Sequence, residues 1–112
     1  MMTQIKINEF IKNSFAYMET NKEVQAVDIR VDHTNPIITP ILDACNTLRW
    51  IGIKDSKIVL KFNGSEITVI KKTMGYNNVK YSARIFYLNS HYTFEMYDAN
   101  ILAISIDLLL NV

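Results

Sequence analysis

The sequence predicts a single α+β domain in which an antiparallel meander of about five strands packs against two or three helices. Three features of the 112-residue chain predict this fold. Asn63-Gly64 lies between two β-rich runs, two further alternating runs follow at 79–97, and helical apolar patterns lie before, between and after the strands. The expected order is helix, strand, helix, four strands, helix. The chain 1–112 forms one domain because its length suffices for one core.

The first two elements are expected to be a helix over 3–20 and a strand over 23–32. In the helix, apolar residues such as Ile7, Phe10 and Ile11 recur at intervals of three and four positions. In the strand, apolar and charged residues alternate from Val27 to Asp32, which is typical of a half-buried strand. The turn residues that follow end it.

A second helix is predicted to open at Thr39-Pro40, because Thr is a fair N-cap and Pro suits the first helical position. Its apolar stripe contains Ile41, Cys45 and Leu48, and Gly52 lies where a helix stop is expected.

The register of the first hairpin follows from Asn63-Gly64, since this pair favours a two-residue type I′ turn. Leu60 then faces Ile67, and Lys61 faces Glu66 as an opposite-charge pair. The predicted core face of this hairpin carries Ile58, Leu60, Phe62, Ile67 and Val69.

The second hairpin is predicted to run over 79–88 and 91–97, with Asn89-Ser90 as its two-residue turn. This register places Arg84 opposite Glu95, again with opposite charges. One face then carries Tyr81, Ala83, Ile85, Tyr87, Tyr92, Phe94 and Met96.

The last element, 99–110, is predicted to be a helix because Asp98 is a good N-cap and the segment is rich in Leu. Its apolar residues surround the axis, which predicts a buried segment, and a buried strand is the alternative.

The composition is that of an ordinary globular protein, with 49% hydrophobic residues and a net charge of +1. Such a small charge does not indicate nucleic-acid binding through the overall field. One cysteine, and an N-terminal segment without a signal-peptide pattern, predict a cytoplasmic protein without disulfides or membrane spans. The abundance of Ile, Asn, Lys and Tyr suggests an AT-rich genome, such as that of a low-GC bacterium, a mobile element or a phage.

No catalytic set is evident, so we expect no enzyme, no cofactor and no metal. The three glycines are far apart, and one cysteine with two separated histidines excludes the common zinc spacings. Cys45 lies on an apolar stripe and is expected in the core. Asp28, Asp32 and His33 could act as acid, base or ligands in an enzyme, but a solvated strand face explains them better.

We therefore expect a small non-enzymatic binding protein that acts through a protein–protein surface, such as an inhibitor, an immunity protein or a phage anti-defence module. A homodimer is an alternative use of that surface. The candidate contacts lie on the sheet face away from the helices, unless a further helix covers it: Val59, Ile70, Phe86, Leu88 and Tyr97. The second hypothesis is a nucleic-acid-binding module that uses a lysine-rich hairpin surface: Lys57, Lys71, Lys72, Tyr76 and Lys80.

Overall fold

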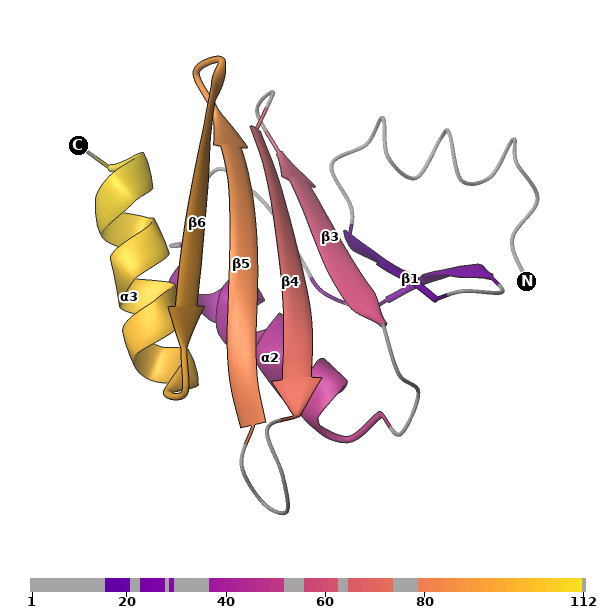
Figure 1. The fold of residues 1–112 in the computed structure, drawn as a ribbon. Helices are drawn as coiled ribbons and strands as arrows, with labels where there is room; N and C mark the ends of the chain where they lie inside the picture. Colours follow the sequence, from indigo (N-terminus) through magenta and orange to yellow (C-terminus); the bar gives the residue numbers. More distant parts are fainter. Residues whose placement is uncertain are drawn as a thin grey trace.

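Six antiparallel strands and two helices form the part of the chain that the computed structural model describes, which is residues 16–20, 23–27, 29, 37–51, 56–62, 65–73 and 79–111. The strand order in the sheet is β2-β1-β3-β4-β5-β6 (Figure 1). The α+β class, the antiparallel sheet and the single compact domain are confirmed. The strands are β1 (Ala16–Glu19), β2 (Val24–Ala26), β3 (Lys57–Phe62), β4 (Ser65–Thr73), β5 (Val79–Tyr87) and β6 (Ser90–Met96), and the helices are α2 (Ile38–Arg49) and α3 (Ala99–Leu110).

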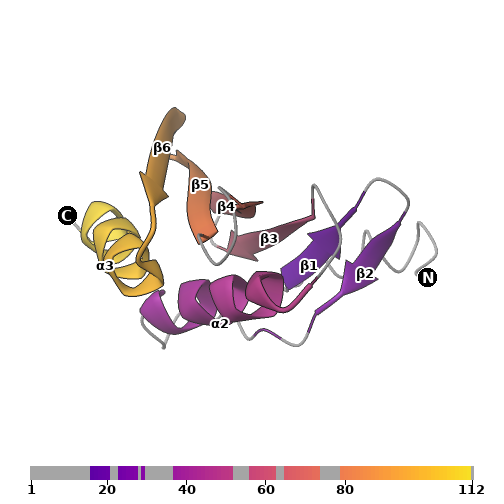
Figure 2. The same cartoon turned by 60° about the horizontal axis from the view of Figure 1, so that its bottom comes forward.

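Both helices lie on the same face of the sheet, which we call the helix face (Figure 2). Alternate strand residues point into this layer and meet the buried stripes of α2 and α3, since successive side chains of a strand point to opposite faces. Each fully buried Leu or Ile side chain contributes about 1.5–3 kcal/mol relative to an exposed one. The core includes Ile58, Leu60, Ile67, Val69, Ala83 and Ile85 from the sheet, Ile41, Ala44, Cys45 and Leu48 from α2, and Leu102, Ala103 and Ile106 from α3.

Residues 16–19 form β1, so the predicted helix over 3–20 is wrong at its C-terminal end; residues 3–15 lie outside the described part. Ala16 and Met18 are buried while Tyr17 and Glu19 are half-buried, which is a period of two. Pairing with both β2 and β3 satisfies the backbone of β1 from both sides. Of the strand predicted over 23–32, the structure has β2 at Val24–Ala26.

The first hairpin has the register that Asn63-Gly64 predicts. Leu60 pairs with Ile67 and Lys61 with Glu66, whose charged atoms are 3.6 Å apart. The turn residues themselves lie outside the described part, as do the side chains of Phe62 and Thr73. This register directs Ile58, Leu60, Ile67 and Val69 into the core, as predicted.

The second hairpin turns one residue earlier than predicted, at Leu88-Asn89, where both residues have positive φ (50° and 63°). Positive φ at both central positions is the type I′ geometry, whose twist matches that of the strands. Tyr87 therefore pairs with Ser90, and Glu95 lies opposite Ser82 rather than opposite Arg84 as predicted. Each residue's partner therefore shifts by two positions, and because side chains alternate with a period of two, the predicted set of residues still shares one face.

Helix α2 begins at Ile38, one residue before the predicted N-cap Thr39, and Ile37 occupies the cap position without a side-chain hydrogen bond. Pro40 is tolerated because the N–H groups of the first turn have no partner within the helix. The predicted stripe of Ile41, Cys45 and Leu48 is buried, as expected.

Helix α3 confirms the predicted cap and helical state, since the Asp98 carboxylate accepts hydrogen bonds from the backbone N–H groups of Asn100 (2.8 Å) and Ile101 (3.4 Å). The expectation that the whole segment is buried is wrong. Leu102, Ala103 and Ile106 are buried, but the opposite side of the helix is exposed. The sheet and α2 cover only one side, so apolar residues remain on the outer side.

Candidate protein-binding surface

The five predicted protein contacts do not form one patch. Val59 is 2% exposed, so it offers no surface to a partner, and Ile70 and Phe86 are half-buried. Leu88 (76% exposed) lies in the β5–β6 turn, whereas Tyr97 (58% exposed) follows the opposite end of β6. The register explains this separation, because β6 runs the full distance between them.

The sheet face opposite to the helices, here the second face, carries ion pairs across its strands. Glu95 on β6 lies 2.8 Å from the Lys72 ammonium and 3.0 Å from that of Lys80. Hydrogen bonds and charge from these lysines lower the pKa of Glu95 to about 2. Hydrogen bonding and charge from Glu95 in turn raise the pKa of Lys80.

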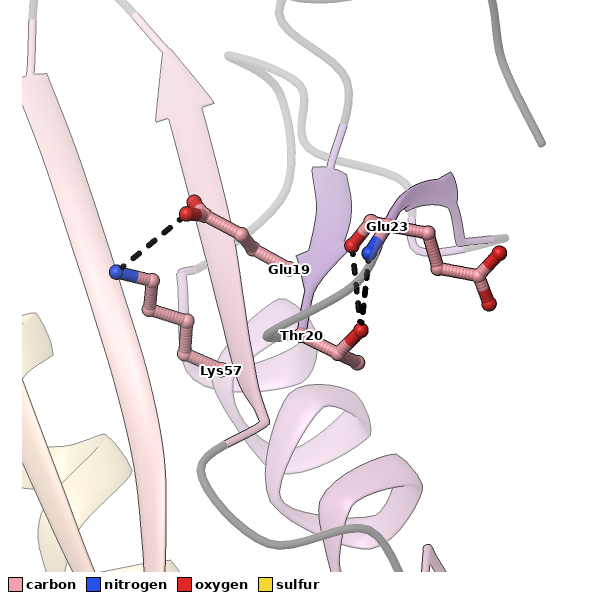
Figure 3. Close-up of polar contacts among 4 residues, drawn as sticks. All are labelled: Glu19, Thr20, Glu23 and Lys57. Carbon is pink, nitrogen blue, oxygen red and sulfur yellow. Dashed lines mark hydrogen bonds and ion pairs between the residues drawn. The ribbon is translucent and has the colours of Figure 1, made fainter.

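Polar contacts also link the strands at the β1–β2 end of the sheet (Figure 3). Glu19 on β1 pairs with Lys57 on β3 at 3.8 Å. In the β1–β2 connection, the Thr20 hydroxyl donates to the Glu23 carbonyl and accepts from the Glu23 backbone N–H, each at 3.3 Å. These bonds stabilise the connection between β1 and β2 at this edge of the sheet, where the outer strand, β2, has three residues.

The residues predicted for nucleic-acid binding do not share one surface. Lys57, Lys72 and Lys80 are paired with carboxylates on the second face. Lys71 points to the helix face, where its ammonium donates to the Ile51 carbonyl at 2.6 Å. Tyr76 lies outside the described residues. Because each of the four lysines already has an acceptor, the described lysines form no free basic patch.

The outer side of α3 carries an apolar stripe whose residues were not among the predicted contacts. Ile101, Ile104 and Leu108 are 53%, 49% and 63% exposed, and their spacing of three and four residues places them on one side of the helix. We call these three residues the α3 stripe. Comparing the number of large apolar residues with the helix and sheet surfaces that could bury them could have revealed this stripe. A chain of this size has few helices and strands, so some apolar side chains remain exposed.

The β6 strand lies beside helix α3 and is an edge of the sheet (Figure 1). It has seven residues, of which Ser90 to Thr93 are exposed, and it contains neither proline nor lysine, the residues that usually protect an edge. The other edge, β2, is much shorter. β6 is therefore the longer of the two edges available for pairing in the described sheet.

An open hollow of about 540 Å³ lies between the C-terminal half of α2 and the start of α3. Arg49 and Asp98 contribute opposite charges to it, and Tyr81 contributes a phenol whose pKa is raised mainly by burial and partly lowered by Arg49. Its lining residues are Leu42, Asn46, Arg49, Tyr81, Tyr97, Asp98, Ala99 and Asn100, which offer no nucleophile paired with a base.

Cys45 is a core residue, as predicted, with 1% of its surface exposed. Burial raises the pKa of its thiol to about 12, which disfavours a nucleophilic thiolate. The described residues contain no group of three or more potential metal-ligating side chains. Asp28, Asp32 and His33, the candidates for the enzyme hypothesis, lie outside the described part.

Comparisons with known proteins identify no relative: no family model, curated protein or solved structure matches this chain. Neither of the described helices has the length and hydrophobicity required to cross a bilayer.

Proposed function

We propose that this protein is a non-enzymatic binding module that acts by occupying a surface of another protein. The observation that supports this proposal is the α3 stripe, where three large aliphatic side chains are each about half exposed or more. Contiguous exposed apolar side chains, unlike apolar residues scattered singly over a surface, are typical of protein–protein contact sites. An inhibitor, an immunity protein or an anti-defence module would use such a surface, in the cytoplasmic location expected from the sequence.

The second face supports a nucleic-acid function less well. Lys72 and Lys80 share one carboxylate, so contact with phosphates would first have to break these ion pairs. The α3 stripe has no positive charge with which to bind a nucleic acid, since Asp107 is the one charged residue of α3.

A site-specific photocrosslinker tests the proposal in the cells that produce the protein. Replacing Ile104 with a photoreactive phenylalanine analogue should give a discrete crosslinked protein product, and adding Leu108→Glu should abolish it because a charge is then placed in the apolar contact. Asp43, which is exposed on α2, provides the matched control position. Absence of a product from position 104, or equal products from both positions, would refute the proposal.

A further inference from the structure

We infer that the occupant of this surface is an extended segment of a partner protein that pairs with β6 as a seventh strand, with apolar side chains toward α3 and acidic ones on the second face. This inference rests on the proposed function and specifies the partner's chemistry. It follows from the backbone of β6, the position of α3 and the charges beside the edge.

The backbone of β6 presents three residues to an incoming strand. Tyr87 and Ser90 close a two-residue turn, and such a closing pair exchanges both backbone hydrogen bonds. Hydrogen-bonded pairs then alternate along the ladder, so Ser90, Tyr92, Phe94 and Met96 bond to β5. The N–H and C=O groups of the intervening residues, His91, Thr93 and Glu95, therefore point away from the sheet.

Helix α3 provides an apolar surface next to this edge. In Figures 1 and 2 it lies to the outer side of β6, the last strand of the sheet. The Ser105 hydroxyl contacts the Met96 sulfur at 3.8 Å, which marks the side of α3 that faces the end of β6. Ile101 and Leu108 are four residues before and three after Ser105, so they continue the same side. A strand added to β6 would place alternate side chains against them.

The charges beside the edge favour an acidic segment. On the second face, the ammonium groups of Lys72 and Lys80 are both paired with Glu95. Arg84, on the same face, is exposed and lies directly opposite Thr93. No described carboxylate forms an ion pair with Arg84. A side chain opposite Thr93 on an added strand would lie within reach of its guanidinium.

The two faces of the added strand therefore require side chains of different chemistry. Those that project to the helix face flank Tyr92, which is 37% exposed, and cover Ile101 and Leu108 of the α3 stripe. Those that project to the second face lie beside His91, Thr93 and Glu95. Alternating apolar and acidic residues satisfy both sides, because strand side chains alternate with a period of two.

Binding of synthetic peptides to the full chain tests the inference, by fluorescence polarisation at low salt. The probe is a peptide of about nine residues that alternates Val with Glu and Thr, and the matched control replaces each Glu with Lys. We expect the acidic peptide to bind the wild-type chain about tenfold more tightly than the basic one. Arg84→Glu should reverse this preference, which loss of folding cannot do.

Thr93→Pro tests the backbone pairing. It removes an N–H that points away from β5, so the β5–β6 ladder is retained and the fold should persist, as circular dichroism would verify. We expect at least about a tenfold loss of peptide affinity. Unchanged affinity in Thr93→Pro, or no binding of the acidic peptide by the wild-type chain at about 1 mM, would overturn the inference.

The outcomes also separate this inference from the proposed function. A crosslinked protein at Ile104 without peptide binding would leave the binding function intact and exclude a strand-like occupant. Self-association that Thr93→Pro abolishes, again without peptide binding, would assign the β6 edge to a second copy of the chain and would equally overturn the inference.

Discussion

Two leucines of α3 provide a direct test of the exposed stripe. Leu102 and Leu108 are in the same helix and differ mainly in environment, since Leu102 is 0% exposed and Leu108 is 63% exposed. Replacing each with alanine removes the same atoms and changes helix propensity equally. We expect Leu102→Ala to destabilise the protein strongly and Leu108→Ala to leave its stability almost unchanged.

The magnitude for Leu102→Ala follows from its complete burial. Removing three carbon atoms forfeits about 0.8 kcal/mol each in transfer free energy, or about 2.4 kcal/mol. The residual cavity among the core residues raises the loss to about 3–4 kcal/mol, within the range measured for buried leucines. At Leu108 about one third of the side chain is removed from water and no cavity forms, so the loss should stay below about 0.5–1 kcal/mol.

Urea unfolding followed by circular dichroism measures both values. With a slope of about 1–1.5 kcal/mol per M, Leu102→Ala should lower the midpoint by about 2 M or more and Leu108→Ala by less than about 1 M. If Leu108→Ala proves as destabilising as Leu102→Ala, the stripe packs within the molecule, and the premise of the binding surface fails. If Leu102→Ala left the urea midpoint unchanged, the assignment of Leu102 to the core side of α3 would be refuted.

Three further predictions concern a turn, the thiol and the ion pairs. Leu88 has a φ of 50°, which costs a residue with a Cβ about 1 kcal/mol, so Leu88→Gly should stabilise the hairpin by up to about that amount in urea unfolding, and destabilisation would argue against the type I′ turn. Cys45 should react with a thiol reagent far more slowly in the native protein than in denaturant, because it is buried and the pKa of its thiol is raised to about 12, and equal rates would contradict its core position. The pKa of Glu95 is lowered to about 2, so the stabilisation from its pairs with Lys72 and Lys80 is fully present above about pH 4.5 and is lost as the pH falls through 2. NMR titration of the Glu95 carboxyl should show this midpoint, Glu95→Gln should flatten the acid limb of the stability profile, and a midpoint near 4.5 would show that the pairs do not form in solution.

Several elements could be predicted because local chemistry specifies them. Asn63-Gly64 has few turn geometries available, so the β3–β4 register followed from two residues. Asp98 supplies the N–H acceptor that a helix start requires, and α3 begins directly after it. The stripe of Ile41, Cys45 and Leu48 identified the buried side of α2.

Other features depend on partners distant in the sequence. Residues 16–19 form a strand because β2 and β3 pair with them, and no local pattern specifies those neighbours. The second hairpin could close at either of two adjacent residue pairs. The wrong prediction preserved the face because the partner of each residue shifted by two positions, which is one full side-chain period. For the candidate site, the sequence supplied the separate residues, but their neighbours across the sheet decided which of them remain accessible.

The sequence by itself therefore determined the fold class, the first hairpin and the start of the last helix, since turn and capping energies act over a few residues. Only the tertiary structure decided which apolar side chains stay exposed. Leu102 and Leu108 are chemically identical members of one apolar segment, and the sheet and α2 can cover one side of a helix but not the other.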